Sequence, residues 1–168
     1  MYPHTLKIIF LLLTIFSLAT NANTINKQDV PKQVFDYIYK KHPEAKDITV
    51  EAKTHFGQSL YEVTFTANQN DRNGQVFQEK LVNLFRVNGH FYTNAIVVQH
   101  AAFNIIPTAT IKSLQLNYPK YEILGVKTVD NPNGVGEEYE IDLLVSGNIW
   151  NISIDNQGKI ISETRNDK

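Results

Sequence analysis

The sequence predicts an α+β protein made of two tandem repeats, each with one helix packed on a four-stranded antiparallel sheet. Two observations support this fold class. The stretches that begin at Val30 and Ile106 both place proline after a β-branched residue, and both reach an X-Pro dipeptide further on, His42-Pro43 and Tyr118-Pro119. Each is followed by segments in which apolar and polar residues alternate, the period of half-buried strands. One structural pattern is therefore expected twice.

The N-terminal segment is set aside before the fold is considered. Lys7 precedes an apolar run from Ile8 to Phe16, and small and polar residues follow as far as Ala22. This order is typical of a secretory signal peptide, with cleavage after Ala22 or after Ala19. The run is shorter than the roughly 20 residues that span a bilayer. We expect residues 1–22 to be removed, with no stable membrane insertion afterwards.

The amino-acid composition limits the cellular compartment and the classes of partner that can be expected for this chain. The 168 residues include no cysteine, so a disulfide framework, a lipoprotein attachment site and a thiol nucleophile are all excluded. Secretion without cysteine favours a bacterial envelope protein, periplasmic or secreted. The 16 basic and 17 acidic residues form no basic cluster. Nucleic acid is therefore not expected as a partner.

Each repeat is expected to begin with a helix. In the first, Val30, Val34 and Ile38 recur at helical spacing, Asp29 is a candidate N-cap, and the helix should end at His42 because the next residue is proline. The second helix should begin at Pro107, carry Ile111 and Leu114 on the same face, and end at Tyr118.

Four strands are expected after each helix. In the first repeat they lie within residues 47–55, 59–65 and 81–98, the last stretch turning at Asn88-Gly89; in the second they lie within 121–129, 137–145 and 149–164. Residues 67–80 form a polar, solvated hairpin excursion that the second repeat lacks. The join at 99–105 has no glycine, serine or proline and should be rigid. The expected units are residues 23–100 and 101–168.

Several of these motifs resemble a known family. The paired Val/Ile-Pro starts, the Tyr-Glu-Val/Ile strands and the series from Ile154 to Ile160 resemble the PepSY-like domains of bacterial secreted and periplasmic proteins. Those domains are similar in fold to the beta-lactamase inhibitor protein. The resemblance extends from Val30 to about Thr164. It implies a non-catalytic role in binding and, in some members, inhibition or regulation of secreted peptidases.

No constellation of catalytic or metal-binding residues is apparent. The five histidines show no paired spacing, and no serine lies in a Gly-x-Ser-x-Gly turn. Residues 68–74 superficially resemble a calcium loop, but the alignment places Lys80 where a carboxylate should bind the ion. We therefore expect no enzyme activity, no cofactor and no metal.

The outward faces of the two sheets are the candidate binding surface. If Tyr139 and Ile141 face the helix, carboxylates point away from it in the second repeat, whereas the first repeat turns apolar residues outward. An apolar outer patch suggests a partner surface, while the carboxylate row alone would be a solvated face. Three other readings stay open: a register error, a homodimer contact, or burial between the two repeats. The predicted partner-binding residues are Leu60, Glu62, Val82, Leu84, Arg86, Glu138, Glu140 and Asp142.

The function expected from these features is that of a protein-binding module, with a secreted or periplasmic hydrolase as its partner class and a homodimer left open. The alternative is a small-ligand carrier or sensor with a pocket between helix and sheet or between the repeats.

Overall fold

The computed structural model describes residues 24–98 and 100–166. The predicted signal peptide, residues 1–22, lies outside them. The elements are η1 (Lys27–Asp29), α1 (Lys32–Lys41), β1 (Lys46–His55), β2 (Gln58–Asn70), β3 (Val76–Arg86), β4 (Phe91–Val98), η2 (His100–Ile105), α2 (Thr108–Asn117), β5 (Tyr121–Asp130), β6 (Glu137–Val145), β7 (Asn148–Asp155) and β8 (Ile160–Asn166). No helix in the described ranges is long and apolar enough to cross a membrane.

All eight strands form one antiparallel sheet in chain order, from β1 to β8. The expected fold of two repeats, each with its own four-stranded sheet, is therefore wrong. The strands β4 and β5 pair from Ala95–Val129 to Val98–Val126. This pairing satisfies backbone groups that two separate sheets would leave open at their edges. The division of the chain near residue 100 stays a prediction; below, residues 24–98 are called the first half and residues 100–166 the second half.

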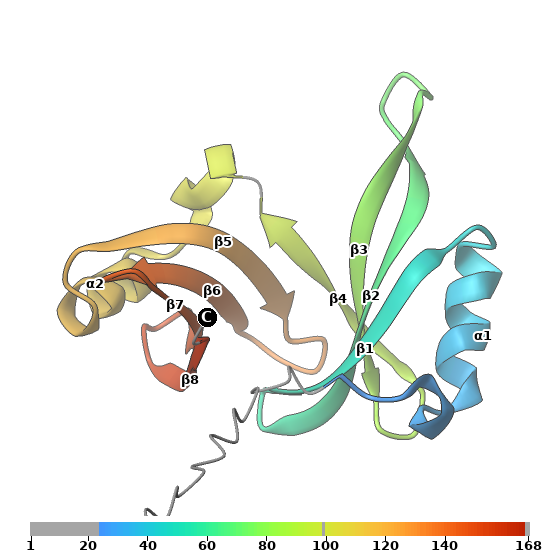
Figure 1. Cartoon of the computed structure of the whole chain (residues 1–168), viewed down its shortest axis with the longest axis horizontal. Coiled ribbons are helices and arrows are strands. Elements are labelled where there is room, and N and C mark those ends of the chain that lie inside the picture. The colour runs from blue at the N-terminus through green and yellow to red at the C-terminus, as the bar shows by residue number, and fades with distance from the viewer. Residues whose placement is uncertain (1–23, 99, 167–168) are drawn as a thin grey trace, which may run out of the picture.

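The sheet curls strongly, and the two helices lie outside the curl at opposite ends of the molecule (Figure 1). α1 packs Val34 and Ile38 on β1–β3, and α2 packs Leu114 on β6 and β7. The helices end at His42 and Tyr118, as predicted. Asp29 is not the N-cap of α1, because the cap position is Pro31 and Asp29 belongs to η1.

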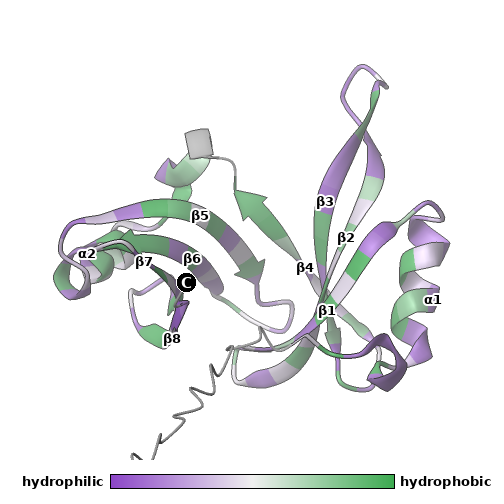
Figure 2. Ribbon diagram, viewed as in Figure 1, coloured by the Kyte–Doolittle hydropathy of each residue, from purple (hydrophilic) through white to green (hydrophobic). Residues whose placement is uncertain are grey.

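A third apolar cluster fills the inside of the curl. We call this cluster the concave core. Its members lie on four neighbouring strands, β2 to β5, and are Leu60, Val82, Leu84, Tyr92, Ala95 and Val129. Phe56 packs against them. Figure 2 shows hydrophobic segments on these central strands interrupted by hydrophilic ones. Helices therefore cover the outer face of the sheet, and on its inner face the first-half residues of the concave core pack with Val129 of the second half.

The β2–β3 hairpin projects from the rest of the sheet (Figure 1). Its ladder continues in register to Asn70–Val76, whereas β3 and β4 pair only between Val82 and Phe85 of β3. The polar segment predicted as a solvated excursion is thus a regular two-stranded ribbon, closed by a turn in which Asp71 Oδ1 accepts hydrogen bonds from the amides of Asn73 and Gln75.

Candidate functional site

The structure buries most of the predicted binding residues. Leu60, Val82 and Leu84 belong to the concave core, and Glu62, Glu138 and Glu140 lie beside it, each no more than 7% exposed. Their direction away from the helices agrees with the sequence analysis. The reading that fits is burial between the two halves, because the two outward faces pack against each other across the curl. These six side chains form no exposed face, and their partner-binding role stays a prediction.

The remaining two predicted residues are half-buried at the margins. Arg86 lies 5.0 Å from the ring centroid of Tyr92 and donates to Gln58 Oε1 at 3.3 Å. Asp142 Oδ1 accepts a hydrogen bond of 2.9 Å from the side chain of Asn151 on β7. Neither residue joins the buried carboxylates.

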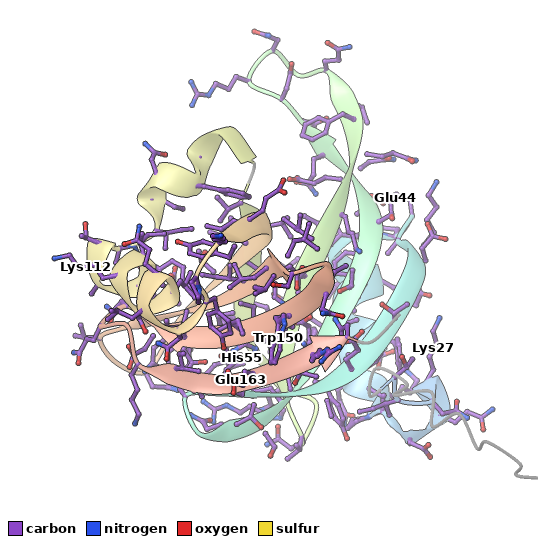
Figure 3. All side chains as sticks on the ribbon, turned by 60° about the vertical axis from the view of Figure 1, so that its left-hand side comes forward. Lys27, Glu44, His55, Lys112, Trp150 and Glu163 are labelled. Atoms are coloured by element: carbon purple, nitrogen blue, oxygen red, sulfur yellow. The ribbon has the colours of Figure 1, made fainter. Side chains whose placement is uncertain are left out.

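His55 is the centre of the candidate site. It ends β1, is 1% exposed, and lies in the interior of the molecule (Figure 3). Its Nδ1 lies 3.0 Å from Glu138 Oε2, and its Nε2 lies 3.2 Å from Glu140 Oε1 and 4.0 Å from Glu62 Oε2. Nε2 makes no contact of hydrogen-bond geometry with any described residue. The imidazole therefore lies among three carboxylates.

Two lysines complete a charge cluster, by which we mean His55, Lys53, Lys127, Glu62, Glu138 and Glu140. The ammonium of Lys127, on β5, pairs with Glu62 and lies 2.8 Å from Glu140 Oε2. Lys53 Nζ, on β1, lies 3.4 Å from the same oxygen. Contacts therefore join β1 and β2 to β5 and β6 directly across the inside of the curl.

The titration of these groups follows from their mutual contacts. Burial alone would lower the pKa of His55, but the carboxylates of Glu138 and Glu140 outweigh it and raise that pKa above its usual value. Burial likewise opposes the charge on Lys127, yet Glu140 and Glu62 raise its pKa. The pKa of Glu140 is lowered despite burial, because His55, Lys127 and Lys53 favour its ionised form. The contacts of the cluster thus favour the charged forms of His55, Lys127 and Glu140.

A strained turn fixes one edge of the cluster. Phe56 and Gly57 join β1 to β2 with positive φ angles of 51° and 70°, a backbone conformation that a bulky residue adopts only at a cost of about 1–2 kcal/mol. Two contacts offset that cost: the ring of Phe56 packs on the concave core, and its N–H donates to Glu138 Oε1 at 2.8 Å. Glu138 therefore binds both His55 and the turn after it.

The spacing of the cluster also resembles that of a metal site. One ligand atom each of His55, Glu62 and Glu140 lies within 4.8 Å of the others. The ammonium of Lys127, however, already pairs with both carboxylates. Lysine thus takes the position that a cation would occupy, and we interpret the cluster as an ion-pair network without a metal.

Two hollows open beside the cluster and at the end of α2. One, of about 380 Å³, lies between the halves and is lined by Phe56, Gly57, Glu137, Glu138 and the β7–β8 turn. The other, of about 450 Å³, is lined by Tyr118, Trp150 and Glu163, among others. The hydroxyl of Tyr118 donates to Glu163, and burial with this carboxylate raises the pKa of Tyr118.

Sequence reasoning missed the cations of the site. His55 appeared as a lone histidine at a strand end, and Lys53 and Lys127 gave no pattern with the glutamates. One signal was available: carboxylates directed to the inner side of a closed sheet need cations beside them. The pairing itself depends on the curl, which no local pattern encodes.

Comparisons with known proteins give likeness of structure only. No protein-family model matches the chain, and no curated protein sequence matches it. Similar solved structures include a BLIP-like protein from Bacteroides fragilis, with 17% identity, a TM-score of 0.44, and coverage of 81% of this chain and 86% of that one. A DUF2874 family protein from Bacteroides uniformis has 15% identity, a TM-score of 0.46, and coverage of 81% and 89%.

A third similar structure is a protein of Bacteroides eggerthii whose name proposes a periplasmic location, with 12% identity, a TM-score of 0.46, and coverage of 81% and 88%. TM-scores below 0.5 are too low to transfer a function, a ligand or a binding face to this chain. Membership of the PepSY-like family stays a prediction.

Proposed function

We propose that this chain is a non-catalytic binding module of the bacterial envelope, periplasmic or secreted, that docks a protein partner at the free edge of its β2–β3 hairpin. The observation that carries the proposal is the unpaired stretch of β3. From Val76 to Leu81, β3 pairs with β2 on one side and with no described strand on the other. The envelope location rests on the N-terminal sequence, and the partner class, a hydrolase, on the family resemblance.

The backbone of this edge is free to bind. The amide of Asp71 donates to the carbonyl of Gln75, and the ladder continues from there without a shift. Because hydrogen-bonded pairs alternate along an antiparallel ladder, the N–H and C=O groups of Val76, Gln78 and Lys80 point away from β2. Such a row is a template for an incoming strand.

The side chains of the edge define the kind of segment that fits. Val76 and Phe77 are large apolar residues that are 61% and 44% exposed. Glu79 and Lys80 follow as exposed charges. An extended segment of another protein, apolar where it meets Val76 and Phe77 and charged beyond them, would satisfy both features.

The test places a photo-crosslinking residue at Lys80 and compares two substitutions at Gln78. Gln78→Pro removes an outward N–H but no hydrogen bond to β2, whereas Gln78→Ala keeps the N–H. We expect one crosslinked partner in the native envelope that survives Gln78→Ala and is lost with Gln78→Pro. Equal capture by both variants, with both folded by circular dichroism, would reject strand addition. A crosslink between two copies of this chain would show that the edge serves self-association and does not bind a hydrolase.

A small-ligand carrier is the second candidate function. The hollow beside Tyr118 and Trp150, whose ring centroids are 6.0 Å apart, is of the size of ligand pockets. Native mass spectrometry of the protein purified from its own envelope tests this function. A retained mass that Trp150→Ala abolishes would favour it, and the bare chain mass would count against it.

A further inference from the structure

We propose that the charge cluster is a protonation-dependent clasp: it holds the curl of the sheet closed while His55 is protonated, and it releases the two halves when His55 loses its proton. This inference does not depend on docking at the hairpin.

The contacts of the cluster cross the curl and do not follow the ladder. In the sheet, β1 and β6 are separated by four strands. Yet His55 on β1 contacts Glu138 on β6, Lys53 on β1 contacts Glu140 on β6, and Lys127 on β5 contacts Glu62 on β2. Backbone hydrogen bonds would survive an opening of the curl, whereas these side-chain contacts would not.

The charges balance only when His55 is protonated. The charged groups around the imidazole are Glu138 and Glu140 from β6, Glu62 from β2, Lys127 from β5, and Lys53 and Glu51 from β1. Glu51 is at the rim, its side chain 33% exposed. The three buried carboxylates therefore face two lysines and His55, and loss of the histidine proton leaves one buried negative charge unpaired, which is unfavourable.

The hydrogen-bond donors of the His55 imidazole also favour its protonated form in the closed curl. Ionised carboxylates only accept hydrogen bonds, and a neutral imidazole has one donor. A neutral His55 that donates from Nδ1 to Glu138 would leave the lone pair of Nε2 3.2 Å from the Glu140 carboxylate, whereas an imidazolium places positive charge beside both carboxylates.

The direction of the pH effect follows from linkage. In the closed curl the pKa of His55 is raised, whereas an opened, hydrated histidine has its usual value of about 6.5. The closed form thus binds the proton more tightly. Its extra stability is fully present below the usual pKa and is lost as the pH rises through the raised one. Each unit of difference changes the ratio of closed to open forms about tenfold.

Opening would uncover the concave core. Leu60, Val82 and Leu84 are each at most 5% exposed, and they pack in one cluster with Val129 of the second half. Once the curl opens, they form a contiguous apolar surface, of the kind that marks a binding site. The clasp would therefore control access to the inner face of the sheet.

The test measures the distance between the two halves as a function of pH. The chain has no cysteine, so spin labels at two exposed positions need no background removal: Gln157→Cys in the second half, which lines the hollow, and Ser59→Cys in the first half, two residues after the lining residue Gly57. We expect a short, narrow distance distribution at pH 6 and a population of longer distances that grows steadily as the pH rises to 9. The same titration followed by NMR at the His55 ring should share its midpoint.

Two variants separate the clasp from other titrations. His55→Gln should show the longer distances at both pH values, and His90→Gln, which changes an exposed histidine, should behave like the parent. Distances that stay constant from pH 6 to 9 while His55 titrates would overturn the proposal. A His55 ring that is neutral at pH 6 would overturn it too, and this measurement on the unsubstituted chain is decisive even if His55→Gln fails to fold.

Discussion

At the scale of single residues, the strongest constraint is the burial of charge. Lys127 is the cation between Glu62 and Glu140, and its side chain is only 14% exposed. Removing one partner of a buried ion pair leaves the other charge uncompensated, which is far more costly than losing an exposed pair.

Lys127→Met should therefore lower the free energy of unfolding by about 3–5 kcal/mol. Lys32→Met is the matched control, because Lys32 pairs with Asp36 on the exposed surface of α1, and it should change stability by no more than about 0.5 kcal/mol. Urea denaturation of both variants measures the difference. Similar small losses would mean that the cluster is hydrated.

The lowered pKa of Glu140 predicts how the free energy of unfolding changes at acid pH. Its pKa is lowered in the folded chain, so its contribution is present above the usual glutamate pKa and is lost as the pH falls toward the lowered value. Glu140→Gln should flatten the acid limb of a denaturation series between pH 6 and 2. A variant that keeps the full acid dependence of the parent would show that other carboxylates carry it.

At the scale of elements, local patterns predicted the helix ends, the strands and the direction of most side chains. The prediction that Asp29 caps α1 was wrong, because Asp29 belongs to η1 and Pro31 is at the cap position. The solvated hairpin expected at residues 67–80 is present, but its strands continue β2 and β3 in one ladder, and that continuity was not predicted because the composition is polar.

Gly158 links a turn to a helix. Its φ is +86°, and a Cβ there would lie 2.6 Å from the carbonyl oxygen of Ala109 in α2. Gly147 also has positive φ, +81°, but has nothing within 4 Å. Gly158→Ala should therefore lower the melting temperature several degrees more than Gly147→Ala, because only the former displaces a helix. Calorimetry of the pair decides this, and equal shifts would count against close packing of α2 on the turn.

At the scale of the whole molecule, the sequence predicted the helix and the four strands of each half. It did not predict that all eight strands join in one sheet. The decisive interactions join residues far apart in the chain, such as His55 with Glu138, and they exist only because the sheet curls. Curl arises from the twist summed over eight strands, a property without a local signature. The alternative of burial between the repeats was the one that matched.

A single sheet with a shared concave core should unfold as one unit. The only tryptophan, Trp150, lies in β7 of the second half, so its fluorescence reports on that half. Val34→Ala removes buried methyl groups in the α1 core of the first half and should cost about 2 kcal/mol. We expect the Trp150 transition to shift with it. An unchanged Trp150 transition would show that the halves unfold independently.

We infer that the charge cluster holds the two halves together across the inside of the curl. A double-mutant cycle of His55→Gln and Glu138→Gln measures this coupling, because these residues belong to opposite halves and lie 3.0 Å apart. The structure predicts a coupling free energy of about 1–3 kcal/mol at pH 6. Effects that add to within about 0.5 kcal/mol would contradict it.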